Sequence, residues 1–180
     1  MKILICLLSL MFFSCATNRN IILYDKIDVI KKEYNKNHQN DIVVLISKDF
    51  NPTKIIIRKL KFELKNDNII YVFSWANTMP TTRAIKFRAL LYDINTQKKY
   101  YISNSFENYK NIVIEFSSDD FKGMENILSF YLKKESDNLK NFTTKDYPPE
   151  MTQDYYIFDT ENNKVLILNS IVFDKDGNPH

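Results

Sequence analysis

Cys15 is the residue whose type and position most directly suggest chemistry, because it stands where the apolar run from Ile3 to Phe13 ends and polar residues begin. The chain has only two cysteines, and the other, Cys6, lies inside that run. If the run is removed from the mature protein, the Cys15 thiol has no partner for a disulfide within the chain. A lone thiol is unusual in an oxidising compartment, so its position predicts covalent modification.

The apolar run before Cys15 has the features of a secretory signal. It follows a single positive charge at Lys2, and it is too short to cross the ~30 Å hydrocarbon core of a bilayer as a permanent helix. Small residues follow it at Ser14 and Ala16, where a signal peptidase needs narrow side chains. These features predict export of the protein.

The residues Phe12-Phe13-Ser14-Cys15 resemble the lipobox of bacterial lipoproteins. This resemblance implies that diacylglycerol alkylates the thiol and that cleavage leaves Cys15 as the first residue of the mature chain. Residues 1–14 are then a lipoprotein signal peptide and residues 15–20 a polar tether. Ala16 stands where some inner-membrane lipoproteins carry Asp, so the resemblance favours a location in the bacterial cell envelope, on the outer membrane facing the periplasm.

Two other fates of this segment stay open. Lipoproteins most often have Leu at the position of Phe12, and an ordinary signal peptidase that cleaves after Ala16 would use Ser14 and Ala16 as its small pair. In the second alternative the segment is an uncleaved anchor or a buried segment, and Cys15 is one more apolar residue.

Residues suited to catalysis or metal binding are scarce in the rest of the chain. The only histidines, His38 and His180, lack the spacing of a catalytic triad or a zinc site. The segment DKDGN, residues 174–178, resembles the opening of a calcium-binding loop. The sequence ends before the acidic residue that such loops place at their twelfth position, so we expect a polar turn there. We expect no metal and no cofactor.

Carboxylates are plentiful, and two of them facing each other would permit glycoside hydrolysis. The candidates Asp93, Glu115 and Asp159 stand at expected strand ends or in turns, where acidic residues are usually solvated. We therefore expect no catalytic residues and no enzyme, with an envelope hydrolase as a distant alternative.

Apolar residues at helical spacing predict two helices. The first is expected over residues 22–34, with its buried stripe at Leu23, Ile27, Ile30 and Tyr34. The second is expected over residues 118–135, with capping oxygens from residues 117–120. Its expected stripe is Phe121, Met124, Leu128, Tyr131 and Leu132.

Alternation of apolar and charged residues predicts strands. Residues 54–65 are expected to pair with residues 69–76 in a central hairpin, with three side chains pointing inward: Leu60, Phe62 and Leu64. Two further hairpins are expected within residues 85–103 and 158–168, where an aromatic residue and Asp close one strand, a polar turn follows and Lys opens the next. Additional strands are expected at residues 42–46 and 112–116.

These elements predict an α+β fold. Residues 21–180 are expected to form a single domain, with a mainly antiparallel sheet of about six to eight strands built from hairpins and two helices packed on it. The hydrophobic content of 44% is that of a globular protein. Only two glycines occur, Gly123 and Gly177, which argues against a glycine-rich phosphate loop.

Two segments rich in aromatic and amide residues, 74–83 and 146–156, are expected to be surface loops. Aromatic rings anchor interfaces or stack on sugars, and an arginine can bind a carboxylate. The residues expected to form a binding surface are Trp75, Arg83, Tyr147, Tyr155 and Tyr156.

The charge pattern restricts the partners. The formal net charge is +3, and charges of both signs are spread along the chain, so nucleic-acid binding is not expected. The sequence favours a protein held to the membrane by lipid at Cys15 that acts as a binding module for a protein or glycan partner. An immunity lipoprotein that neutralises a toxin would be one example. The alternative is a structural accessory subunit of an envelope complex.

Overall fold

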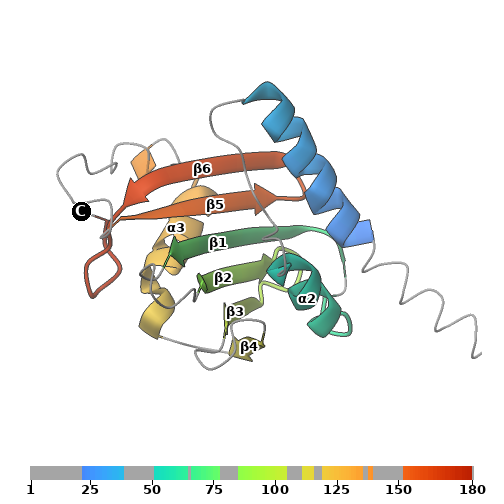
Figure 1. The fold of residues 1–180 in the computed structure, drawn as a ribbon, viewed down its shortest axis with the longest axis horizontal. Coiled ribbons are helices and arrows are strands. Elements are labelled where there is room, and N and C mark those ends of the chain that lie inside the picture. The colour runs from blue at the N-terminus through green and yellow to red at the C-terminus, as the bar shows by residue number, and fades with distance from the viewer. Residues whose placement is uncertain are drawn as a thin grey trace, which may run out of the picture. The chain divides into compact units, whose positions relative to one another are not determined.

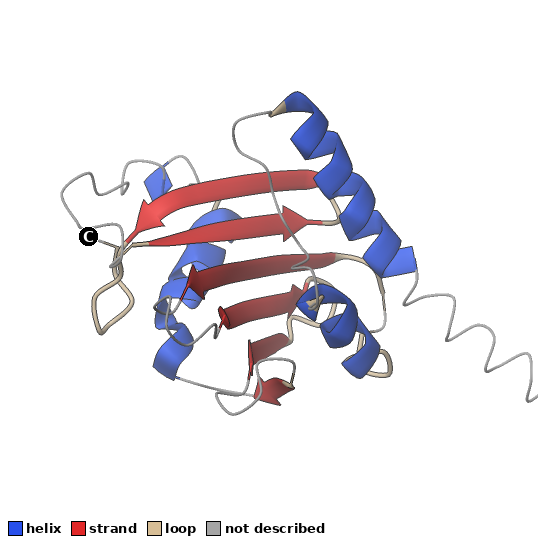
Figure 2. Ribbon diagram, viewed as in Figure 1, coloured by secondary structure: helices blue, strands red, loops and turns tan. Residues whose placement is uncertain are grey.

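The computed structural model describes residues 22–38, 51–64, 66–77, 85–104, 111–115, 119–135, 138–139 and 152–179. The chain divides into two compact units, Met1–Asp67 and Asn68–His180. The fold is α+β and its single sheet is antiparallel and open, as the sequence predicts (Figures 1 and 2). The expected signal peptide and tether lie outside the described residues, and the single domain over residues 21–180 stays a prediction. In the described ranges, no helix combines the length and the apolar character needed to span a membrane.

The first unit begins, in its described part, with a helix over residues 22–37. Most of its predicted apolar stripe is confirmed, because three members are buried: Leu23, Ile27 and Ile30. The fourth member, Tyr34, is partly exposed, and its ring stacks on that of His38 with the ring centroids 4.0 Å apart. The expected strand at residues 42–46 lies outside the described residues.

Helix α2 (Pro52–Lys59) occupies the segment that was expected to be the first strand of the central hairpin. The predicted inward strand is therefore wrong. Leu60 is buried at the end of the helix, but Phe62 is 77% exposed and Leu64 is only partly buried.

Local physical chemistry explains why this segment is helical. The side-chain oxygen of Asn51 accepts a hydrogen bond of 3.0 Å from the backbone N–H of Lys54, which caps the helix, and Pro52 follows in the first turn, where its missing N–H costs nothing. Ile56, Ile57 and Leu60 then lie on one buried side at helical spacing. The described part of the alternation over residues 59–65 falls at the end of the helix and in the turn that follows it, where the helix signals outweigh it.

The second unit contains the sheet. Its strands run in the order β4-β3-β2-β1-β5-β6, and every neighbouring pair is antiparallel (Figure 1). The central strand β1 pairs with β2 and β5, and not with residues 54–65. The strands are β1 (Ile69–Asn77), β2 (Ile85–Asp93), β3 (Lys99–Asn104), β4 (Ile112–Glu115), β5 (Gln153–Asp159) and β6 (Lys164–Ile171).

The two predicted hairpins with shared turn chemistry are confirmed as β2–β3 and β5–β6. In the first, the carboxylate of Asp93 accepts hydrogen bonds from the backbone N–H groups of the residues two and three positions later, at 3.0 Å each. Asp159 makes the same pair of bonds at the same distances in the second. Each turn then ends with a residue of positive φ, Gln97 or Asn163. The two turns are therefore equivalent in structure.

Helix α3 (Lys122–Leu132) covers one face of the sheet, behind β1 and β2 in the view of Figure 1. It follows the short 3₁₀ helix η1 (Asp119–Phe121). Two polar contacts support this packing. The hydroxyl of Tyr131 donates to Asp159 at 2.8 Å, and the hydroxyl of Tyr101 donates to Glu125 at 2.6 Å. The apolar core between α3 and the sheet includes Ile70, Val72, Leu90, Met124, Ile127, Leu128 and Ile157.

The predicted features of this second helix are confirmed only in part. Phe121, not a polar residue, occupies the N-cap position, and its own side chain makes no capping hydrogen bond. Of the expected capping residues, 117 and 118 lie outside the described residues, and Asp120 belongs to η1 and pairs with Arg88. The expected burial of Leu132 is wrong, because the helix ends there and the side chain is 48% exposed.

Candidate functional site

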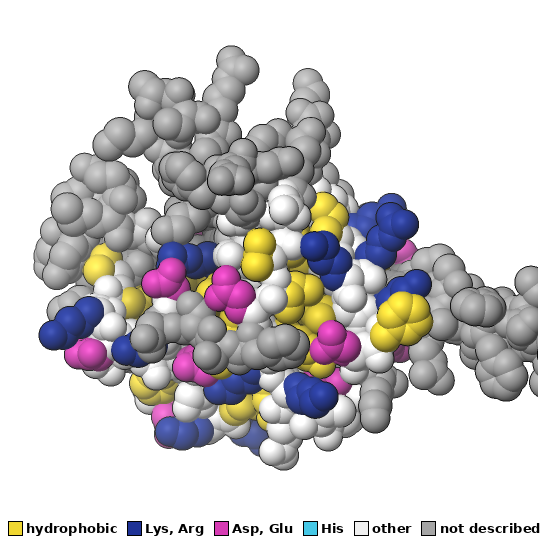
Figure 3. All heavy atoms as spheres, turned by 90° about the horizontal axis from the view of Figure 1, so that it is seen from below, with side chains coloured by type: hydrophobic (Ala, Val, Ile, Leu, Met, Phe, Trp, Pro, Cys, Tyr) yellow, Lys and Arg dark blue, Asp and Glu magenta, His cyan; other side chains and the backbone are white. Residues whose placement is uncertain are grey.

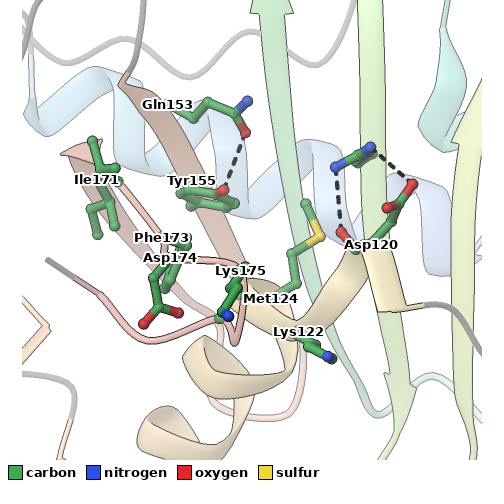
Figure 4. Close-up of a pocket in the computed structure, with 13 residues that line it drawn as sticks. Asp120, Lys122, Met124, Gln153, Tyr155, Ile171, Phe173, Asp174 and Lys175 are labelled. Carbon is green, nitrogen blue, oxygen red and sulfur yellow. Dashed lines mark hydrogen bonds and ion pairs between the residues drawn. The ribbon is translucent and has the colours of Figure 1, made fainter.

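A cavity of about 300 Å³ opens at one end of the sheet in the second unit. Side chains from β2, η1, α3 and β5 line it, together with the end of β6 and the turn that follows (Figure 4). By strand register, this end of the sheet is opposite to the two hairpin turns. We call this cavity the end pocket.

A polar row crosses the sheet beneath the end pocket. Ser74 on β1 lies opposite Arg88 on β2 and opposite Tyr155 on β5. Cross-strand partners project from the same face of a sheet, so these side chains are neighbours on the face that α3 covers. Ser74 is 3% exposed and Tyr155 is 7% exposed, which places polar groups of the row in a largely dry environment.

Two hydroxyl groups of this region meet one amide oxygen. The Tyr155 hydroxyl donates a hydrogen bond of 3.1 Å to Oε1 of Gln153. The Ser74 hydroxyl lies 3.5 Å from the same oxygen. Figure 4 shows Gln153 and Tyr155 side by side on β5 with their side chains joined by this bond. The amide oxygen thus fixes the direction of both hydroxyls.

Arg88 carries the positive charge of the polar row. Its Nη2 lies 3.2 Å from Oδ2 of Asp120, and its Nη1 donates to the backbone oxygen of the same residue at 3.3 Å. The guanidinium also lies 5.9 Å from the ring centroid of Phe121. The Asp120 side chain is 71% exposed, and an ion pair so open to water contributes only about 0–1 kcal/mol. Another anion could therefore replace Asp120 at Arg88 at little cost in free energy.

Burial raises the pKa of Tyr155 to about 12, although the charge of Arg88 acts in the opposite direction. The phenol stays protonated at neutral pH because its ring is withdrawn from water. In the end pocket it is a hydrogen-bond donor and not a base.

The turn after β6 forms one wall of the end pocket. The carboxylate of Asp174 accepts hydrogen bonds of 2.8 Å from the backbone N–H groups of Asp176 and Asn178, and one of 3.2 Å from the Asn178 amide. Gly177 has a φ of 81°, which glycine adopts without strain. The segment expected to be a polar turn is such a turn, and its carboxylate serves the turn itself.

The structure places the expected binding residues in different environments. Tyr155 lines the end pocket. Tyr156, the next residue on β5, stacks on Phe73 with ring centroids 5.0 Å apart. The backbone of Trp75 lies in β1, opposite Phe87 and Asp154. Two further expected residues lie outside the described residues: Arg83 and Tyr147.

Parts of the two segments that were expected to be loops belong to the sheet. Residues 74–77 end β1 and residues 153–156 begin β5, and these stretches pair with each other. The expectation of a loop is therefore wrong for residues 153–156, whereas for residues 74–76 the strand that is also expected over 69–76 is confirmed as the end of β1. The pairing of the two stretches places Ser74 beside Gln153 and Tyr155, and the side chains of the latter two line the end pocket.

The remaining chemical candidates are separate from this site. Asp93 and Asp159 are buried turn residues at the opposite end of the sheet, and Glu115 is exposed on β4. His38 is exposed beside Tyr34 in the first unit. In the part of the chain that the structure describes, no three His, Cys, Asp or Glu side chains are grouped to hold a metal ion.

Arg88, Gln153 and Lys175 line the end pocket but are not among the expected site residues, because no motif in the sequence indicates that their separate segments meet. One signal was present in the sequence. Both of its glycines lie where the turn after β6 meets α3, and glycine is rare enough in this chain for its two positions to mark a close backbone approach.

Comparisons with known proteins give no relative from which a function could be transferred. No protein-family model matches the chain, and neither curated proteins nor solved structures give a significant match. A functional proposal must therefore come from the site and the sequence.

Proposed function

We propose that this chain is a lipid-anchored protein of the bacterial cell envelope and that its second unit is a binding module whose ligand occupies the end pocket. The end pocket itself carries this proposal. Ligand sites are typically clefts of roughly 300–1,000 Å³, lined by apolar side chains and a few polar groups that fix orientation. The end pocket has a volume of about 300 Å³ and brings Arg88, Gln153 and Tyr155 to one place.

The exposed lining of the end pocket is mainly polar, with a smaller apolar part. Met124 and Ile171 supply buried apolar surface, while Lys175 is exposed at the rim. On the face drawn in Figure 3, basic and acidic side chains are interspersed and neither kind gathers into a large patch. Such a surface favours recognition at a defined pocket over general attraction to a polyanion. Lipid at Cys15 would keep this pocket close to the membrane.

Photo-crosslinking in intact cells tests the proposal. A benzophenone side chain is introduced at Lys175, on the rim of the end pocket, and in a matched variant at Lys164, an exposed lysine at the opposite end of the sheet. The account predicts a defined adduct from position 175 after irradiation and none from position 164. Mass spectrometry of the purified protein identifies the adduct.

Other outcomes would contradict the proposal. Adducts with several envelope proteins from both positions would favour a structural accessory subunit. The absence of any adduct from position 175, in cells where the protein is present at its normal level, would contradict the proposed binding module.

A further inference from the structure

The Arg88 guanidinium already holds a carboxylate at the end pocket. The Asp120 carboxylate and the backbone oxygen of the same residue both accept from it, at 3.2 and 3.3 Å. A planar guanidinium with parallel donors matches the geometry of a carboxylate. The Asp120 side chain is largely exposed, so water can solvate its carboxylate when a second carboxylate takes its place at Arg88.

The other charges of the lining also favour an anion. Lys122 and Lys175 line the end pocket together with Arg88, and the acidic residues of the lining are Asp120 and Asp174. The Asp174 carboxylate already accepts three hydrogen bonds within its own turn. Among the described residues, Lys175 forms no ion pair. Arg88, Lys122 and Lys175 carry three positive charges against the two negative charges of Asp120 and Asp174, so the lining presents a net positive charge to an incoming ligand.

The remaining lining limits the size and character of the ligand. Met124, Ile171 and Phe173 provide the smaller, apolar part of the lining, and the Tyr155–Gln153 pair provides polar groups (Figure 4). A volume of about 300 Å³ is at the small end for ligand sites, so it fits one side chain and its carboxylate better than an extended glycan.

We propose that the end pocket binds a carboxylate carried by a small apolar group, the chemistry of an N-acylated apolar amino acid or of a peptide's C-terminal residue. This inference rests on the proposed binding function. The carboxylate takes the place of Asp120 at Arg88, the apolar side chain contacts Met124, Ile171 and Phe173, and the amide meets the polar groups of β5.

Calorimetric titration of the full-length protein in detergent tests this assignment. The probes are N-acetyl-leucine, its uncharged amide, inorganic phosphate, and acetyl-Ala-Ala-Leu with a free or an amidated C-terminus. Both free acids should bind, and both amides and phosphate should bind at least about tenfold more weakly, because a charge-assisted pair to Arg88 is lost. Tighter binding of the tripeptide acid would identify a peptide terminus, and equal affinities a free acid.

Substitutions locate the binding. Arg88→Gln should weaken N-acetyl-leucine binding about tenfold or more, and Arg88→Lys should weaken it less. Arg58→Gln is the matched control, because Arg58 is an exposed arginine on α2 outside the end pocket. Asp120→Asn should strengthen binding a few-fold by removing the competing charge, and a loss of folding cannot produce a gain in affinity.

The assignment is overturned if acids and amides bind equally, if phosphate binds as tightly as the acids, or if Asp120→Asn weakens binding in a protein that melts normally. The proposed binding function can hold even when this assignment fails. An adduct at position 175 with a ligand that has no carboxylate would leave the binding module intact and remove only this assignment.

Discussion

Gly123 and Gly177, the only glycines in the chain, lie against each other where the turn after β6 meets the start of α3. A Cβ atom at Gly177 would lie 2.8 Å from the backbone nitrogen of Gly123 and 2.6 Å from the carbonyl carbon of Lys122. A Cβ atom at Gly123 would lie 2.7 Å from the ring of Phe173. The Gly177 oxygen accepts a hydrogen bond from the Asn126 amide. One wall of the end pocket thus depends on the absence of two side chains.

Gly177→Ala should disrupt the contact between the turn after β6 and the start of α3. The substitution adds a Cβ at a φ of 81° and against backbone atoms that cannot move aside, so we expect a loss of about 1–3 kcal/mol in the free energy of unfolding. Amide hydrogen exchange of residues 173–178 should become faster. Lys175→Ala, at an exposed position in the same turn, is the control. Unchanged stability and exchange in Gly177→Ala would disprove the close contact.

The buried phenol of Tyr155 should make the protein sensitive to alkali. An unfolded tyrosine has a pKa of about 10, and burial raises the pKa of Tyr155 to about 12 in the folded protein. The stabilisation that the protonated Tyr155 gives to the folded state is fully present below pH ~10. It is lost as pH rises towards ~12, because the phenol of the unfolded chain loses its proton first.

The readout is denaturant unfolding at pH 8 and pH 11.5. Between pH 8 and pH 11.5, the free energy of unfolding of Tyr155→Phe should fall by roughly 2 kcal/mol less than that of the wild type, because the variant has no phenol to ionise at this position. Ultraviolet titration should show that the variant lacks one late-ionising tyrosine. The same dependence on pH in both proteins would contradict the assigned environment.

Alanine substitutions at Leu60 and Phe62 distinguish the helical turn from the expected strand. Leu60 is 1% exposed, so Leu60→Ala should cost about 2–5 kcal/mol. Phe62 is 77% exposed, so Phe62→Ala should change the free energy of unfolding by no more than about 0.5 kcal/mol. Chemical denaturation of the two variants measures both values. Equal, large losses in the free energy of unfolding would contradict the helical turn and favour the expected strand with both side chains pointing inward.

Local patterns predicted the parts of the fold that local interactions determine. The β2–β3 and β5–β6 hairpins were predictable because Asp93 and Asp159 each build a turn from hydrogen bonds to residues two and three positions away. Residues 54–65 do not form the expected strand, because the Asn51 cap and Pro52 start a helix that outweighs the alternation over residues 59–65.

The end pocket was not predictable in the same way. Arg88, Tyr155 and Gly177 come from three separate segments, and only strand register and the docking of the last turn bring them together. Tyr155 was identified for its aromatic type. Nothing in the sequence indicated that its hydroxyl would bind Gln153 beside a guanidinium.

The lipid anchor at Cys15 is the claim on which the location of the protein depends. Each buried methylene of an acyl chain contributes about 0.8 kcal/mol, so two or three chains bind the membrane far more strongly than this mixed surface does. Cys15→Ser should prevent lipidation and leave the protein unprocessed or released, with the fold of its second unit unchanged.

The most direct test is mass spectrometry of the mature N-terminus from the detergent-soluble envelope fraction, with Cys15→Ser measured in parallel. The account predicts a chain that begins at Cys15 and carries the mass of a diacylglyceryl group on its thiol. An unmodified chain that begins at Thr17 would contradict it.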